Sequence, residues 1–223
     1  MRKLGLAVAV AAAAIGTPAL ADSPDGAWQV KLMATGVLPD GKIVDLRKNA
    51  VGLPAGSQTK ANDNVVPTLA IEYYARPNIS VETICCFTQH HVSGAGPLAG
   101  TDIVDHVLIL PATLTLKYHL NAGPIRPYVG VGPSLFFVFG EKPGATAQAL
   151  GASRVRMSNS VGVALQAGFD MPVGNKGFGI SVDAKRYFLD TTAHFYTAAG
   201  VEALTTRHSL DPWLVSSGVY YRF

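Results

Sequence analysis

Eight segments of the chain alternate large apolar residues with small or polar ones, and this period of two constrains the fold more than any other feature. Such alternation indicates β-strands with one apolar and one polar face. In the last segment, Trp213, Val215 and Val219 belong to one set, and Ser216 and Gly218 belong to the other. The segments comprise residues 27–38, 65–74, 79–89, 106–119, 126–139, 154–170, 178–189 and 211–223. The pattern predicts an all-β protein with eight strands.

The connections between these segments alternate between short and long. The short ones are residues 75–78, 121–125 and 171–177, and the long ones are residues 39–64, 90–105, 140–153 and 190–210. Short turns at one rim and long loops at the other are typical of outer-membrane barrels. A soluble β-sandwich is the alternative, but its polar faces need charge, and only 15% of the residues are charged. We therefore predict an eight-stranded antiparallel up-and-down transmembrane β-barrel with four long extracellular loops.

Residues 1–21 have the composition of a secretory signal peptide. Arg2 and Lys3 precede a short apolar stretch, and Ala19-Leu20-Ala21 forms an A-x-A cleavage site. We expect cleavage here, which leaves residues 22–223 as the barrel domain; a short membrane anchor is the alternative. Loss of the two basic residues lowers the formal net charge from +3 to +1 (3 − 2). The exported chain is then nearly neutral, and its charge does not favour a nucleic-acid partner.

No apolar run of the roughly 20 residues that a membrane helix needs follows the signal peptide. The longest candidate, residues 107–120, contains Pro111 and Lys117 and is rich in residues that favour strands. Two classes of exported protein remain, a secreted β domain and an outer-membrane β-barrel.

Four motifs along the chain carry a family resemblance: LPATLTLKYHL (residues 110–120), RPYVGVGPSLFF (126–137), GFDMPV (168–173) and LDPWLVSSGVYYRF (210–223). They resemble the OmpW family of outer-membrane proteins, and the resemblance spans nearly the whole chain after the signal peptide. It implies a barrel in the outer membrane of a Gram-negative cell. It also implies a narrow hydrophobic channel that takes up small hydrophobic molecules and releases them sideways into the membrane lipid. Colicin receptors occur in the family too, so a structural or interaction barrel, such as an adhesin or a phage or colicin receptor, is the alternative function.

If the apolar rows face lipid, the opposite rows face the lumen and contain charges of both signs. An eight-stranded interior is just wide enough for side chains, and buried charges must pair or stay wet. We therefore expect a salt-bridged plug that closes the periplasmic side to bulk ions, with an ion-selective filter as the alternative. The predicted lumen cluster comprises Lys31, Glu72, Glu82, Lys117, Arg156, Asp183, Lys185 and Arg222.

The long connections contain more apolar residues than exposed loops need. We expect these side chains to form a hydrophobic pocket at the extracellular end, and the alternative is that they only pack the loops against one another. The residues predicted for this mouth are Val51, Leu53, Phe139, Phe195 and Tyr196.

The chain ends on an aromatic residue in register with an apolar stripe. Because an open sheet edge cannot exist in lipid, the last strand must pair with the first. We expect Tyr221 and Phe223 at the periplasmic aromatic girdle. This ending also resembles the signal that the barrel-assembly machinery reads during biogenesis.

Catalytic and metal-binding patterns are weak in this sequence. His208 and Ser209 are adjacent, so on a strand they face opposite ways and do not form a base–nucleophile pair. His90-His91 alone is a poor metal site. The adjacent Cys85 and Cys86 are interpreted as small apolar fillers and not as a disulfide. We expect no enzymatic activity, no cofactor and no metal, and a lipid A-modifying enzyme is the least favoured alternative.

Overall fold

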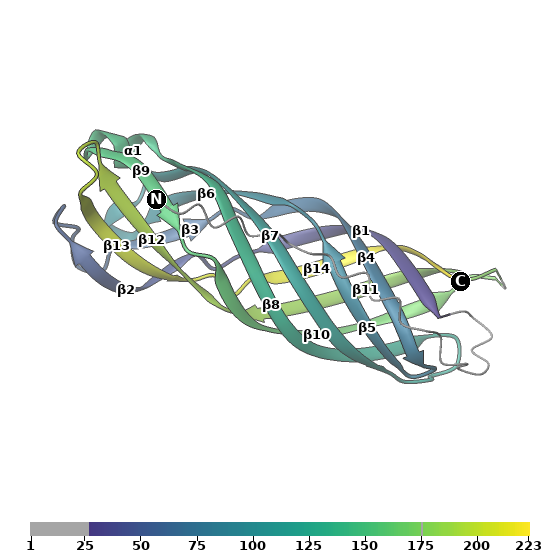
Figure 1. The fold of residues 1–223 in the computed structure, drawn as a ribbon. Coiled ribbons are helices and arrows are strands. Elements are labelled where there is room, and N and C mark those ends of the chain that lie inside the picture. Colours follow the sequence, from purple (N-terminus) through teal and green to yellow (C-terminus); the bar gives the residue numbers. More distant parts are fainter. Residues whose placement is uncertain (1–26, 175) are drawn as a thin grey trace, which may run out of the picture.

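The wall of a closed antiparallel barrel has eight strand positions, and one of them is divided into two shorter strands, so nine strands form it (Figure 1). The computed structural model describes residues 27–174 and 176–223, so the expected signal peptide, residues 1–21, lies outside the described residues. β5 and β6 follow each other along the chain and both pair with β7, so together they make one wall strand, and the wall has eight. The wall strands are β1 (Trp28–Leu38), β4 (Asn64–Arg76), β5 (Ile79–Cys85), β6 (Thr88–Ala95), β7 (Asp102–His119), β8 (Arg126–Pro143), β10 (Ser160–Pro172), β11 (Phe178–Phe188) and β14 (Trp213–Arg222). Each pairs with the next along the chain, which confirms the predicted up-and-down barrel.

The first and last wall strands close the barrel. β1 pairs with β14 from Gln29 opposite Arg222 to Leu38 opposite Trp213. Beyond the ladder, the Trp28 amide donates to the Phe223 carbonyl at 2.9 Å, and the Phe223 amide donates to the Trp28 carbonyl at 2.8 Å. The terminal residue is therefore held by two backbone hydrogen bonds, and no sheet edge is left open along this part of the wall.

Two clusters of aromatic side chains mark the ends of an outward-facing apolar band. At the end that holds Phe223, which we call the turn end, the Tyr221 ring lies 4.7 Å from that of Phe178 and 5.6 Å from that of Phe223. At the other end, the loop end, Phe188 and Trp213 point outward. The ten residue-to-residue steps from Trp213 to Phe223 span about 33 Å along a strand, or about 23 Å of height at a tilt near 45°. That height matches the apolar band of roughly 25 Å that outer-membrane barrels present to lipid.

Beyond this band, the loop end is built largely from further strands. A four-stranded sheet has the order β2-β13-β12-β9, and β3 extends the barrel sheet beside β6. These strands are β2 (Lys42–Asn49), β3 (Gln58–Ala61), β9 (Ala152–Met157), β12 (Asp190–Thr197) and β13 (Glu202–Ser209). Figure 1 shows them continuing the barrel past its wall. We call this region the cap.

The prediction of four long loops is not confirmed, because much of each long connection is strand. Register shifts interrupt the pairing of β13 with β2 and of β12 with both of its neighbours. A bulge moves the alternation to the other face, so a search for a strict period of two does not detect these strands.

Two predicted strands are each interrupted in the structure. The segment 79–89 breaks between β5 and β6. The segment 154–170 consists of β9 and β10, which belong to different sheets. Consequently, side chains at the start of that segment do not face the lumen.

Among the described residues, helical structure is confined to two short elements of the cap, α1 (Ala145–Ala149) and the 3-10 turn η1 (Gly96–Leu98). Across residues 27–174 and 176–223, no helix is both long and apolar enough to cross a membrane.

Candidate functional site

A buried network of charged and polar side chains fills the turn-end half of the lumen. Every one of the eight wall strands contributes to it, because the inward-facing positions of neighbouring strands lie at similar heights. We call it the lumen network. Its members are Gln29, Lys31, Glu72, Tyr74, Ser80, Glu82, Lys117, His119, Tyr128, Gln166, Asp170, Ser181, Asp183, Lys185 and Arg222.

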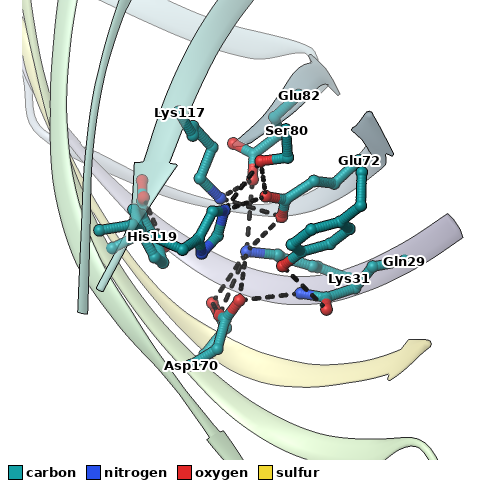
Figure 2. Close-up of polar contacts among 12 residues, drawn as sticks. Gln29, Lys31, Glu72, Ser80, Glu82, Lys117, His119 and Asp170 are labelled. Carbon is teal, nitrogen blue, oxygen red and sulfur yellow. Dashed lines mark hydrogen bonds and ion pairs between the residues drawn. The ribbon is translucent and has the colours of Figure 1, made fainter. Parts of the chain in front are cut away.

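Lys31 of β1 lies at the centre of the network (Figure 2). Its Nζ is 3.0 Å from Glu72 Oε2 and 3.2 Å from Asp170 Oδ1. Asp170 also accepts hydrogen bonds from Gln29 at 3.0 Å and from Ser181 at 2.7 Å. The ammonium group thus lies between carboxylates from β4 and β10, which are far apart in the chain.

Two further lysines bind the carboxylate of Glu82 on β5. Lys117 Nζ is 2.9 Å from Glu82 Oε2 and lies 3.7 Å from the centre of the Tyr128 ring. Lys185 Nζ is 2.9 Å from Glu82 Oε1 and 2.8 Å from Asp183 Oδ1. Charge-assisted hydrogen bonds and cation–π contacts of this kind are strongest where water is excluded.

The lumen network balances its charges and excludes solvent. Three lysines and Arg222 (3 + 1) face four carboxylates. Lys31 and Glu72 are each 0% exposed. Removing one partner of such a buried pair leaves an uncompensated charge, which is strongly destabilising. The arrangement is therefore a rigid filling of the lumen.

Of the predicted lumen residues, the structure brings seven to this region. Six form ion pairs with one another, and Arg222 lies over the Tyr74 ring with its guanidinium carbon 3.6 Å from the ring centre. The prediction for Arg156 is wrong. Its side chain is 63% exposed on β9 of the cap, where it pairs with Glu141 at 3.6 Å. The break between β9 and β10 is the reason.

Sequence reasoning missed several members of the lumen network, notably Asp170, Gln166 and His119. Gln166 donates to Glu82 at 2.9 Å and to Asp183 at 2.6 Å. His119 Nε2 lies 2.9 Å from Glu72 Oε1. Asp170 and Gln166 occupy inward-facing positions of β10, so the alternation along this segment is the sequence signal that could have found them.

A second feature, the cap pocket, lies inside the loop end and is almost wholly apolar. It encloses about 90 Å³. Apolar side chains from η1, α1 and the cap strands line it, together with the upper part of β7. Of the predicted mouth residues, the lining includes Val51, Leu53, Phe195 and Tyr196.

The prediction for Phe139 is wrong. This side chain is 37% exposed on the outer face of β8, and its ring lies 6.3 Å from that of Phe87. It belongs to the loop-end aromatic cluster that faces lipid, because its position in β8 has outward parity.

Two buried histidines border the cap pocket, but protein groups already satisfy their ring nitrogens. His208 contacts Thr206 at 2.7 Å and Thr59 at 3.2 Å. His90 contacts Thr88 at 2.9 Å and the Asn62 carbonyl at 2.9 Å. Burial lowers the pKa of both His90 and His208. Neutral, paired rings leave the pocket with little to offer a polar ligand.

A smaller cavity of about 20 Å³ lies between the cap pocket and the wall. Cys86, Thr88 and Pro111 line it, and it shares His90 with the cap pocket. The thiols of Cys85 and Cys86 are free. The interior is thus apolar above the lumen network.

The wall itself is interrupted beside this cavity, at Cys86 and Phe87 between β5 and β6. Continuing the register of the flanking ladders puts Pro111 of β7 opposite Cys86 and Pro67 of β4 opposite Phe87. Proline has no amide hydrogen to donate to a ladder. The ladders are therefore interrupted here, with a proline on each flanking strand.

His208 and Ser209 do not contact each other through their functional atoms. Whereas His208 binds threonines, Ser209 Oγ donates to Asp211 Oδ2 at 2.7 Å. A hydroxyl hydrogen-bonded to a carboxylate and away from the imidazole lacks the arrangement of an activated nucleophile.

Known proteins resemble this chain along nearly its whole length. The family model described as the OmpW family matches residues 24–223. An uncharacterized outer-membrane protein of Sinorhizobium fredii, y4mB, is 33% identical over 227 residues, which cover 97% of this chain and 91% of that protein. Outer membrane protein W of Vibrio cholerae is 27% identical over 173 residues, which cover 75% of this chain and 77% of that protein.

Solved structures are similar in fold. The outer membrane protein OprG from Pseudomonas aeruginosa matches with a TM-score of 0.77 at 23% identity, covering 89% of this chain and 96% of that one. The barrel fold is therefore one that an experimentally determined outer-membrane protein shares.

Proposed function

The chain belongs to the OmpW family of outer-membrane proteins, and from that premise we propose that it is a channel for small hydrophobic molecules. Solutes enter the cap pocket from outside the cell and leave sideways through the wall into the membrane lipid. In outer-membrane barrels the end with the longer connections faces outside, so the cap is the receiving end.

One observation carries this proposal: an apolar pocket lies directly above a lumen filled with paired charges. A hydrophobic solute that moved down through the lumen network would have to break buried ion pairs, at a cost of several kcal/mol each. The pocket favours the same solute because its lining is apolar. A route that ends in the lipid avoids the network altogether.

The interruption at Cys86 and Phe87 supports a lateral exit. The small cavity behind it adjoins the cap pocket, and prolines on both flanking strands remove ladder donors. Opening the wall at this position therefore breaks few backbone hydrogen bonds.

The proposal is tested with the purified protein in liposomes, by following entry of an apolar solute. We expect faster entry than into empty liposomes, and loss of most of the gain in Leu53→Asp and Phe195→Asp, because each puts a charge into the pocket. Val201→Asp is the matched control, because Val201 is 60% exposed and outside the lining. Equal permeability of protein-containing and empty liposomes would refute transport.

A structural or interaction barrel is the alternative function, and enzymatic modification of lipid A is a weaker one. The contacts of Ser209 and His208 give no support for catalysis, so we propose that the protein is not an enzyme. Mass spectrometry of lipid A from cells with and without the protein tests this, and a protein-dependent change of mass contradicts it.

A further inference from the structure

The cap is made of two sheets, and one of the seams between them is held by side chains and not by a backbone ladder. β2 belongs to the four-stranded sheet and β3 to the barrel sheet, and no backbone ladder joins them. Instead, the side-chain amide of Gln58 accepts from the Ile43 amide at 3.0 Å and donates to the Ile43 carbonyl at 3.1 Å. One side chain thus substitutes for a whole strand pairing.

Both sides of this seam line the cap pocket. Gly41 and Ile43 border it from β2 and the residues before it, and Thr59 and Ala61 border it from β3. On the inner side, Thr59 Oγ1 donates to the Gly41 carbonyl at 2.6 Å. Gly41 adopts a φ of +65°, and a Cβ on it would lie 2.8 Å from the Ala61 nitrogen, so the two chains touch here without a ladder.

The other seam, between β8 and β9, is better covered. Met157 donates its amide to Glu141 at 2.9 Å, and Val138 donates its amide to Asn159 at 3.0 Å. Helix α1 connects β8 to β9 and packs against β7 and β9, with Ala147 in the pocket lining. Two side chains and a helix therefore protect it, whereas the β2–β3 seam has only Gln58 on its outer side.

We propose that the β2–β3 seam is the port through which hydrophobic solutes enter the cap pocket, and that Gln58 is the latch that keeps it closed. This inference rests on the proposed function. β2 is the edge strand of the four-stranded sheet and pairs with β13 along its length, at the loop end (Figure 1). Moving this edge of the sheet away from β3 breaks the two amide hydrogen bonds of Gln58 and the contacts of Thr59 with Gly41 and His208, but no backbone ladder.

The port is tested by chemical access to the pocket, independently of transport. Ala61→Cys places a thiol at a position 5% exposed on the pocket lining, in a background with Cys85→Ser and Cys86→Ala. A water-soluble maleimide then reports seam opening in the barrel held in lipid. Gln58→Met keeps the side-chain length but removes both hydrogen bonds, and we expect labelling to become about tenfold faster or more.

Asn159→Ala is the matched control, because it removes a side-chain hydrogen bond to backbone from the other seam. Labelling that rises in Gln58→Met but stays at the parent rate in Asn159→Ala supports the port. An unchanged rate in Gln58→Met, in barrels whose shift on gels shows that they are folded, overturns the port, as does an equal rise in both variants. If no variant admits apolar solute into liposomes but Gln58→Met still speeds labelling, the transport proposal fails and the latch stands.

Discussion

The lumen network and the cap pocket occupy one continuous interior, yet they are opposites in chemistry and in construction. The network packs charged and polar groups from all eight wall strands into a filled, solvent-free region, and backbone ladders join the strands around it. The pocket packs apolar groups from two sheets around a hollow, and side chains hold the seams. The contrast indicates that a region that fills the lumen and a region that admits a ligand need walls of different construction.

The difference follows from what each region excludes. A neutral cluster of buried charges keeps ions and solutes out only while every partner stays in position, so it needs a rigid frame. An apolar pocket must let its ligand pass, so its frame has to part somewhere at modest cost. Seams closed by one or two hydrogen bonds, each worth about 1 kcal/mol net, meet that need.

Removing Glu82 should have the largest effect on this contrast. Its carboxylate binds Lys31, Lys117 and Lys185, so Glu82→Ala leaves buried ammonium groups uncompensated. We expect the free energy of unfolding to fall by about 3–5 kcal/mol, measured by urea titration of the lipid-embedded barrel. Asp190→Ala breaks an exposed pair with Arg207 in the cap and should cost less than about 1 kcal/mol. Similar losses in both variants would contradict a rigid network.

The conductance of two variants tests whether the lumen network, in contrast to the cap pocket, is a closed filling. Asp183→Ala and Lys185→Ala each remove one side of a 2.8 Å ion pair and open space in the lumen network. In planar bilayers we expect each variant to conduct more than the wild type, because water and ions can enter the space. If neither variant changes the conductance, the network is not the barrier to ions.

Deleting Phe223 tests the part of the wall that serves both regions. The deletion removes the reciprocal backbone pair with Trp28 and one ring of the turn-end aromatic cluster. We expect less folded protein in the outer membrane, with little change in transport for each folded copy. Heat-modifiability on gels measures the folded amount, and liposome uptake normalised to it measures the activity. Phe223→Tyr, which keeps the ring and the backbone, should behave like the wild type.

Acidification should weaken the loop end, and this is the smallest effect. Burial holds the pKa of His90 and His208 below the usual value near 6.5. The unfolded cap therefore takes up protons before the folded cap does. Stability is complete above about pH 6.5 and falls as the pH drops towards the folded pKa.

Hydrogen exchange from pH 8 to 5, corrected for intrinsic rates, should show faster opening of β13 and β6 at the acid end. His208→Asn should reduce the change in β13 and leave that in β6. An equal change in hydrogen exchange in every strand of the wall and the cap would argue that protonation of His90 and His208 is not its cause.

Much of the wall follows from the sequence because lipid imposes a strict alternation on it. Trp213 to Phe223 could be assigned to a strand, a face and a neighbouring strand from parity and from the need to close the barrel. The same alternation places Lys31, Glu72 and Lys185 in the lumen. It also places Asp170 and Gln166 there, although the predicted lumen cluster does not include them.

The cap could not be derived in this way, because water on its outer face relaxes the alternation. Bulges in β2, β13 and β9 shift the alternation there. The break between β9 and β10 puts Arg156 on the outside of the cap, and Phe139 follows the outward parity of β8. The seam held by Gln58 has no signature in the sequence, since a single polar residue in an irregular segment indicates only a loop. Its role depends on which backbone it meets.

The contribution of every wall strand to the lumen network has a consequence for how the protein is made. Lys31 meets Ser181 across 150 positions of the chain, and Gln29 meets Asp170 across 141. A barrel that lacks any one strand carries unpaired charges that hydrocarbon does not tolerate. Strands that entered the bilayer one at a time would leave these charges unpaired in hydrocarbon. The lumen network therefore favours insertion of the barrel with all of its strands together.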